Sequence, residues 1–368
     1  MTSRDTLPFY AKLSFNLLTI SIICAIIFIG KDIIMPFCFA VVLAFLLLPV
    51  NKWLVKMGLP AVPSMLISIL LAVLIIAGIV YFLSTQIAQF TDDLPKIRQN
   101  LDRHISTAQQ WIRENFNITR KEQNDAIESA SQDMKKNGAG MLGTTFLTAA
   151  SALILVVLLP IYTFLLLYYR DLIRHFFISI FPDKHKSSVE EVMFQSRIII
   201  QSYMVGLLIE MAIVAALNAT GFFIIGIEYA IFLAVLAAIL NLIPYVGMLV
   251  ATIICMLITL ANSNDISDIL WVAVVLTVVQ FIDNNIIMPY VVSSKVRINA
   301  LVSIIGVLVG GALAGVSGMF LSIPGIAIMK AVFDRVDGLQ PWGMLLGDDK
   351  TMIKPRLGQR LKKKVKKL

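Results

Sequence analysis

The sequence is short of charged residues. Only 15% of its 368 residues are Asp, Glu, Lys or Arg, whereas a soluble domain usually carries about 25%. Hydrophobic residues make up 58% of the chain, and the mean hydropathy is +0.85. Several apolar runs reach or approach the roughly 20 residues that a helix needs to cross a bilayer. The composition therefore argues against an ordinary soluble domain and predicts an all-α polytopic membrane protein.

Cysteine and histidine are also scarce. The three cysteines lie in apolar runs and show no paired spacing, which argues against a disulfide framework and a zinc site; they are Cys24, Cys38 and Cys255. The three histidines are scattered through polar segments, where we expect ordinary surface residues: His104, His175 and His185. We therefore expect no bound metal and no cofactor.

The motifs of two enzyme classes are incomplete or missing. Residues 315–318 read GVSG, the G-x-S-G form of a rhomboid protease, but a serine nucleophile needs a base nearby and no predicted span contains a histidine. No G-x-x-x-x-G-K-[ST] phosphate-binding loop occurs in the chain. The sequence thus predicts that the protein is not an enzyme, and that any energy coupling comes from an ion gradient.

The apolar runs divide the chain into membrane helices and polar segments. We predict spans at 13–30, 33–50, 62–83, 142–169, 203–226 and 269–288. Two longer apolar stretches, 230–261 and 299–333, are too long for one span and too short for two. Breaking residues interrupt both, so we predict two helical hairpins, for about eight membrane segments in all. The predicted divisions are N-terminal helices at 1–83, a polar helical region at 84–140, a transport core at 141–335 and a basic tail at 336–368.

Lysine and arginine in the loops predict the orientation of the chain. The tail from Lys350 to Leu368 holds nine basic residues and no acid, whereas the segment from Asn262 to Asp268 is acidic. If each hairpin returns to the face it left, and if Lys31–Asp32 forms an outer loop, both termini are cytoplasmic. The tail also suits a helix on anionic lipid, a better interpretation than nucleic-acid binding.

The polar region 84–140 carries a heptad-like apolar stripe that includes Ile97, Leu101 and Ile105. Pro95 argues against one unbroken helix. The stripe has two interpretations. One is an amphipathic helix that packs on the protein's own membrane domain or lies at the membrane interface. The other is a surface for self-association between protomers.

Polar groups inside apolar segments identify candidate substrate- or ion-binding residues, because such groups usually face a cavity or a partner rather than lipid. Glu210 and Asp283 are carboxylates in predicted spans, and each could bind a cation or exchange a proton. Hydrogen bonding between helices is the alternative role. Broken helices at membrane depth also expose backbone groups that transporters use. The remaining candidates lie at the breaks or beside Asp283: Asn241, Pro244, Gly247, Gln280, Asn284, Gly310, Gly311 and Gly315.

The order of the last four segments is repetitive. Segment 203–226 precedes the hairpin 230–261, and segment 269–288 precedes the hairpin 299–333. If the two halves cross in opposite directions, they form an inverted repeat, the architecture of alternating-access carriers.

Three motifs resemble the AI-2E family of transporters, named for autoinducer-2 export. They are Gln201-x-x-x-x-Gly206, the segment NLIPYVG at 241–247, and the stretch from Gln280 to Arg335. One difference is Met248, where the family often has proline. The resemblance implies a homo-oligomer in the bacterial inner membrane that exports a small polar molecule, or exchanges cations for protons. A scaffold or sensor without transport, or a passive channel, remains an alternative.

Overall fold

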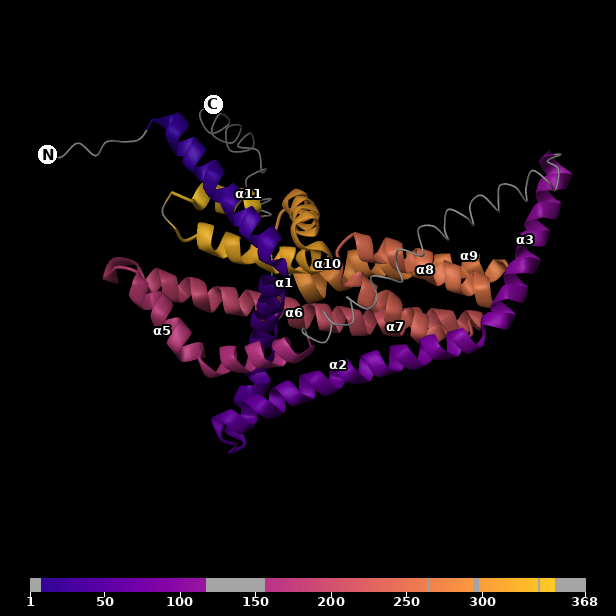
Figure 1. The fold of residues 1–368 in the computed structure, drawn as a ribbon, viewed down its shortest axis with the longest axis horizontal. Coiled ribbons are helices and arrows are strands. Elements are labelled where there is room, and N and C mark those ends of the chain that lie inside the picture. The colour runs from indigo at the N-terminus through magenta and orange to yellow at the C-terminus, as the bar shows by residue number, and fades with distance from the viewer. Residues whose placement is uncertain (1–7, 117–155, 264, 294–297, 337, 348–368) are drawn as a thin grey trace, which may run out of the picture.

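The protein is all-helical in the residues that the computed structural model describes, namely 8–116, 156–263, 265–293, 298–336 and 338–347 (Figure 1). Within these residues, five helices are long and apolar enough to cross a membrane, or six if one bent pair counts as a single span. The chain is thus a multi-pass membrane protein, as its composition predicts. The basic tail, from residue 348 onward, and the segment 117–155 lie outside the described residues.

The first helix corrects a prediction. Helix α1 runs without interruption over Phe9–Lys56, so the two predicted spans 13–30 and 33–50 are one helix. Lys31 and Asp32 do not end it, because both residues tolerate helical geometry; Pro36 and Pro49 also lie inside this helix. The Lys31 ammonium lies over the Phe28 ring, 5.3 Å from its centre. The outer loop that the orientation argument assumed at Lys31–Asp32 is therefore absent.

Helices α2 (Ala61–Asp92) and α3 (Leu94–Phe116) meet at a break at Asp93. The break falls just before Pro95, as expected, since proline is tolerated in the first turn of a helix but not in its interior. Figure 1 shows α2 crossing beneath the other helices and α3 turning away at its end. The predicted span 62–83 lies within α2.

A bent pair and a long helix follow. Only residues from 156 onward of the predicted span 142–169 are described. They form the helix Val156–Tyr168, which bends by 64° into α5 (Arg170–Ile180). Helix α6 (Asp183–Ile225) then extends well before the predicted span 203–226 and ends at Gly226, whose φ of 84° is left-handed. Glycine suits this position because it alone carries no Cβ penalty there.

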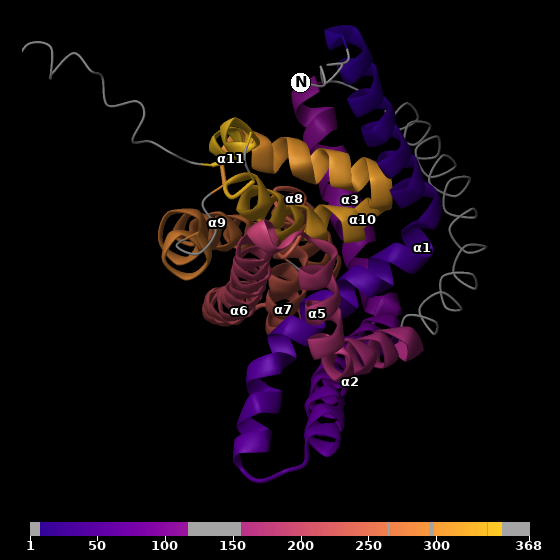
Figure 2. The same cartoon turned by 90° about the vertical axis from the view of Figure 1, so that its left-hand side faces the viewer.

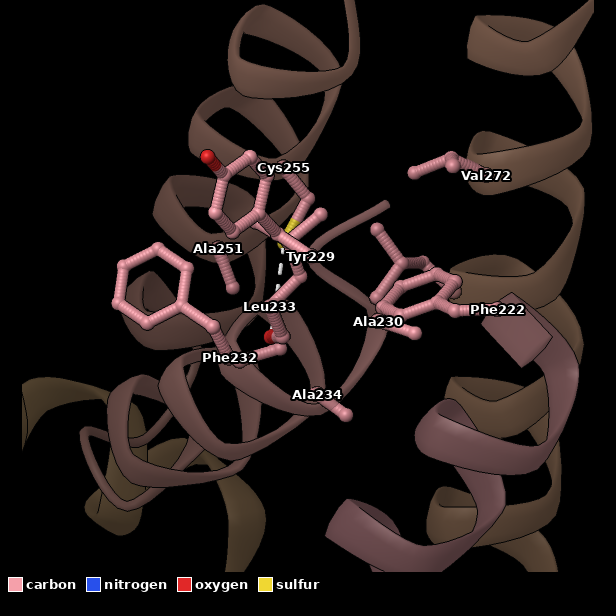
Figure 3. Packing of buried hydrophobic residues seen from close by; sticks show 11 residues of the cluster. Phe222, Tyr229, Ala230, Phe232, Leu233, Ala234, Ala251, Cys255 and Val272 are labelled. Atoms are coloured by element: carbon pink, nitrogen blue, oxygen red, sulfur yellow. Dashed lines mark hydrogen bonds between the residues drawn. The ribbon is translucent and has the colours of Figure 1, made fainter. Parts of the chain in front are cut away.

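The stretch 230–261 breaks where the sequence predicts it. Helix α7 (Ala230–Asn241) and helix α8 (Val246–Asn262) pack against each other on either side of a short connection. Their interface is a buried cluster of small and apolar residues in which the Cys255 thiol lies 3.8 Å from the Leu233 carbonyl oxygen (Figure 3). Phe222 of α6 and Val272 of the next helix complete the cluster.

Helix α9 (Ser267–Ile282) changes from α-helical to π-helical geometry at its end. The π-helices η1 (Asp283–Ile287) and η2 (Pro289–Ser293) continue it. The backbone N–H of Met288 donates to the Asp283 carbonyl, five residues back. Pro289 has no N–H to offer the α-helical ladder, and π-helical turns of this kind are frequent at functional sites.

The stretch 299–333 is also broken. Helix α10 (Ala300–Phe333) is interrupted at Ala314 and Gly315, and Gly315 has a φ of 61°. The Ser322 hydroxyl donates to the Gly306 carbonyl, 2.9 Å away and 16 residues earlier, so the two halves fold back on each other. Figure 2 shows this hairpin beside α1, which it contacts, with the short helix α11 (Gln340–Leu346) next to it.

Helix α3 is held to the ends of the other helices by polar contacts. Asn100 donates to the carbonyls of Ala261, at 3.4 Å, and Asn262, at 3.0 Å. Lys96 pairs with Glu228 at 2.8 Å, and this hydrogen bond raises the pKa of Lys96. Packing of 84–140 on its own membrane domain is thus confirmed for α3.

His104 corrects a second prediction. It is buried rather than a surface residue, and its Nε2 lies 2.9 Å from the Ser263 carbonyl oxygen. That carbonyl follows the end of α8, where helix carbonyls lack partners. The spacing held a signal for this histidine, because His104 lies seven residues after Ile97 and so on the same face of α3.

We expect Asn100→Ala to loosen α3. The change leaves two carbonyls at the end of α8 without their donor, which costs about 1–3 kcal/mol for a buried group. Faster amide hydrogen exchange in α3 and in residues 259–263 should report it. Gln99→Ala, at the exposed neighbouring position, is the matched control; equal exchange in both variants would contradict the role assigned to Asn100.

Candidate functional site

Four parts of the chain line a cavity of about 890 Å³. They are α6, the α7–α8 break with the first half of α8, the junction of α9 with η1, and α10 with Ile298 just ahead of it. Polar groups gather on one part of the wall and apolar side chains form the rest. The polar and aromatic lining residues are Tyr203, Glu210, Asn241, Tyr245, Thr252, Gln280, Asp283, Asn284 and Ser303.

Two carboxyl groups from different helices meet in this cavity. Glu210 of α6 is 8% exposed and Asp283 of η1 is 2% exposed. The two groups share a hydrogen bond, and the Asn241 amide donates to Asp283 Oδ2 at 3.1 Å. Ionised carboxylates only accept hydrogen bonds, so the bond between Glu210 and Asp283 requires a proton on one of them.

Each carboxyl group also keeps one oxygen free. Within the described part of the chain, Glu210 Oε2 and Asp283 Oδ1 are buried without a hydrogen-bond partner. The described lining includes no lysine, arginine or histidine. Buried polar atoms are normally satisfied, and the exceptions call for an unseen partner or a functional role. The arrangement can therefore accept hydrogen-bond donors or a positive charge from a ligand.

The break that carries Asn241 has an unusual backbone. Tyr245 has φ 64° and ψ −42°, and the Val246 N–H donates to the Pro244 carbonyl at 2.7 Å. This is the γ-turn with positive φ at its centre, a rare and strained conformation. Pro244 and this turn stop α7 and turn the chain into α8, which places Asn241 and Tyr245 at the cavity wall. Strain of this type tends to occur at ligand-binding and switch regions.

We expect Tyr245→Gly to be more stable than Tyr245→Ala by about 1 kcal/mol, because alanine keeps the Cβ that is unfavourable at positive φ and glycine removes it. Both variants lose the same ring, so their difference isolates the backbone. Thermal unfolding in detergent micelles measures it. An alanine variant as stable as the glycine variant would show that the turn is not strained.

The structure brings together six of the ten candidate residues: Glu210, Asn241, Pro244, Gln280, Asp283 and Asn284 line the cavity. The Gln280 amide donates to Asn284 Oδ1 at 3.0 Å. The glycines lie elsewhere. Gly247 is buried against Leu240, Gly310 and Gly311 pack against the opposite half of α10, and Gly315 lies at its turn.

Two lining residues, Thr252 and Ser303, have no signal in the sequence. They lie in helical runs where threonine and serine are unremarkable, and their positions at the cavity follow only from how the helices pack. Tyr203 did have a signal: it lies seven residues before Glu210, with Leu207 between them, and so on the same face of α6.

A family model described as AI-2E family transporter matches residues 17–338. The chain belongs to the AI-2E transporter family. The match covers every described element that lines the cavity, and transport rather than catalysis is the activity of this family.

Several curated relatives are similar to this chain over most of their length. “Putative transport protein YueF” of Bacillus subtilis is 26% identical, with 84% of this chain and 85% of the relative covered. “Putative transport protein YrrI” of the same organism is 23% identical, with coverage of 82% and 86%. “AI-2 transport protein TqsA” of Escherichia coli is 25% identical, with coverage of 89% and 92%.

Proposed function

We propose that this chain is a secondary transporter that exports a small polar molecule with ion coupling, and that the cavity at Glu210, Asp283 and Asn241 is its binding site. One observation carries the proposal: two buried carboxyl groups from different helices share a hydrogen bond and each keeps an oxygen free. Intramembrane carboxyl groups of this kind typically lie on ion and substrate pathways. The name of TqsA makes autoinducer-2 the first molecule to test.

The carboxyl pair gives a physical basis for coupling. Two carboxyl groups in contact do not both ionise without a countercharge. A fully protonated pair has the same net charge as a singly ionised pair that holds one monovalent cation. Exchange of one proton for one such cation thus leaves the buried charge unchanged, and this makes it the least costly change of occupancy.

Two broken helices next to the site support an alternating-access mechanism. The unit of α6 with the α7–α8 hairpin precedes a second unit, α9 with the α10 hairpin. We propose that these units form an inverted repeat and that movement of one against the other exposes the cavity to each side in turn. The wall contains residues from both units, as such movement requires.

Cation/proton antiport is the second candidate function. The free oxygens of Glu210 and Asp283 favour it, since they suit a positive charge. In this case the cation is itself the cargo and the proton is its counter-ion. A scaffold or sensor would need no such pair, and a passive channel would need no exchange of occupancy.

We place the protein in the bacterial inner membrane as a homo-oligomer. The relatives are bacterial, and the basic loops and the basic tail support a cytoplasmic C-terminus. The tail is proposed to bind anionic lipid. Self-association through the stripe of α3 is a further part of this proposal, and the exposed side chain of Ile105 is consistent with it.

Proteoliposomes test the proposed function. We expect flux of a small metabolite or a cation that saturates and responds to sodium or proton gradients imposed one at a time. Flux that does not saturate and ignores counter-gradients would favour a channel. No flux of any tested solute, from protein that is folded and oligomeric, would favour the scaffold.

A further inference from the structure

We propose that the cavity binds an organic ammonium ion, a protonated amine with a small apolar body. This inference rests on the proposed function, because it names the substrate class of the same site. Its basis is the composition, size and hydrogen-bonding pattern of the wall.

Charge excludes one class of ligand. The described lining residues include two carboxylic acids and no basic side chain. An anionic ligand would therefore meet like charge without compensation in a buried site. A cation would neutralise the singly ionised pair of Glu210 and Asp283. A neutral ligand would leave the negative charge of the pair uncompensated.

The free acceptors match an ammonium group. An ammonium ion has three N–H donors and no acceptor. Glu210 Oε2 and Asp283 Oδ1 are without partners among the described residues. The side-chain nitrogen of Asn241 donates to Asp283. The side-chain oxygen of Asn241 is therefore a third acceptor beside the pair.

The size and the apolar wall favour an organic body over a bare ion. A cavity of about 890 Å³ falls in the range of sites that enclose small organic molecules, and a bare metal ion needs oxygen ligands on all sides. The rest of the wall is instead aliphatic. Apolar lining residues come from α6, α8, the end of η1 and α10, and they include Leu207, Met248, Leu249, Ile253, Met288 and Ile323.

The test is a calorimetric titration of the purified full chain in detergent at pH 7. The probes are butylammonium, butan-1-ol, butyrate and sodium ions, at constant ionic strength. We expect binding of butylammonium and no binding of butanol or butyrate. From methylammonium to butylammonium, each added methylene should tighten binding by up to about fourfold, the factor that corresponds to burying a CH₂.

Variants distinguish binding in the cavity from effects of the detergent. Asp283→Asn should weaken butylammonium binding by about 30-fold or more, since it removes one partner of a buried charge pair. Glu191→Gln is the control; it removes a carboxylate of the same helix as Glu210, outside the cavity, where Glu191 pairs with Arg335. Its affinity should equal that of the wild type.

Three results would overturn the inference: binding of sodium without binding of any alkylammonium, equal affinity for all chain lengths, or undiminished binding by Asp283→Asn. The proposed function has a separate point of failure. If Glu210 and Asp283 are needed for flux of another solute while alkylammonium ions do not bind, the transporter assignment stands and only the substrate class is wrong.

Discussion

Asp283→Asn and Glu210→Gln are each expected to lower coupled transport by about a hundredfold or more. Both side chains are buried, hydrogen-bonded to each other and free on one oxygen. Each change replaces a carboxyl group by an amide of nearly the same shape, which cannot release a proton or carry a negative charge. A bound cation then loses one partner of a buried charge pair, which costs about 2–5 kcal/mol of binding; about 2.7 kcal/mol corresponds to a factor of a hundred.

The readout is initial flux in proteoliposomes under an imposed proton gradient, with the amount of folded oligomer measured in the same preparation. Neither amide should lower the unfolding temperature strongly, because removing a buried charge offsets the lost hydrogen bond. Glu191→Gln, on the exposed part of α6, should transport normally. Full coupled flux in both amide variants would remove Glu210 and Asp283 from the mechanism.

Gly247→Ala is expected to produce the largest loss of stability. A Cβ at Gly247 would lie 1.7 Å from the Leu240 carbonyl oxygen and 2.6 Å from its carbon. These are backbone atoms of α7, so no side-chain rotation can relieve the clash. The two helices of the hairpin would have to separate, at a cost of at least about 1–3 kcal/mol, and Asn241 would shift with the end of α7.

Gly78→Ala is the matched control, since a Cβ at Gly78 in α2 meets nothing within 4 Å. Alanine should leave its stability unchanged or raise it by up to about 1 kcal/mol. Thermal unfolding and the yield of monodisperse protein in detergent compare the two variants. Similar behaviour of Gly247→Ala and Gly78→Ala would contradict the close packing of α7 and α8.

Local chemistry explains which parts of the fold the sequence predicts. Pro244 is unfavourable in a helix interior, and the chain breaks between Asn241 and Val246. Gly315 likewise marks the interruption of α10. The pair Lys31–Asp32 carries no such restriction, and there the expected loop is helix. Polarity alone does not predict a break, and neither does proline alone, since Pro36 and Pro49 lie inside α1 and Pro324 inside α10.

The candidate site is predictable only in part for a similar reason. Glu210, Asn241 and Asp283 are polar residues in apolar segments, and this conflict identifies them as candidates. Their meeting in one cavity depends on how three separate elements pack, which periodicity does not encode. The glycines of α10 show the opposite case, because the sequence suggests them as binding residues and they do not line the cavity. Gly310 is required because its neighbour is the backbone of Gly318, a packing role that sequence does not distinguish from a binding role.

The most direct test of the account is a measurement of proton movement driven by a cation. Proteoliposomes that contain a pH-sensitive dye receive an outward or inward gradient of sodium or butylammonium, and the internal pH is followed. The account predicts proton flux opposite to the cation flux in the wild type, and none above empty liposomes in Asp283→Asn. Cation flux without proton movement, or proton movement that survives Asp283→Asn, would contradict exchange at the Glu210–Asp283 pair.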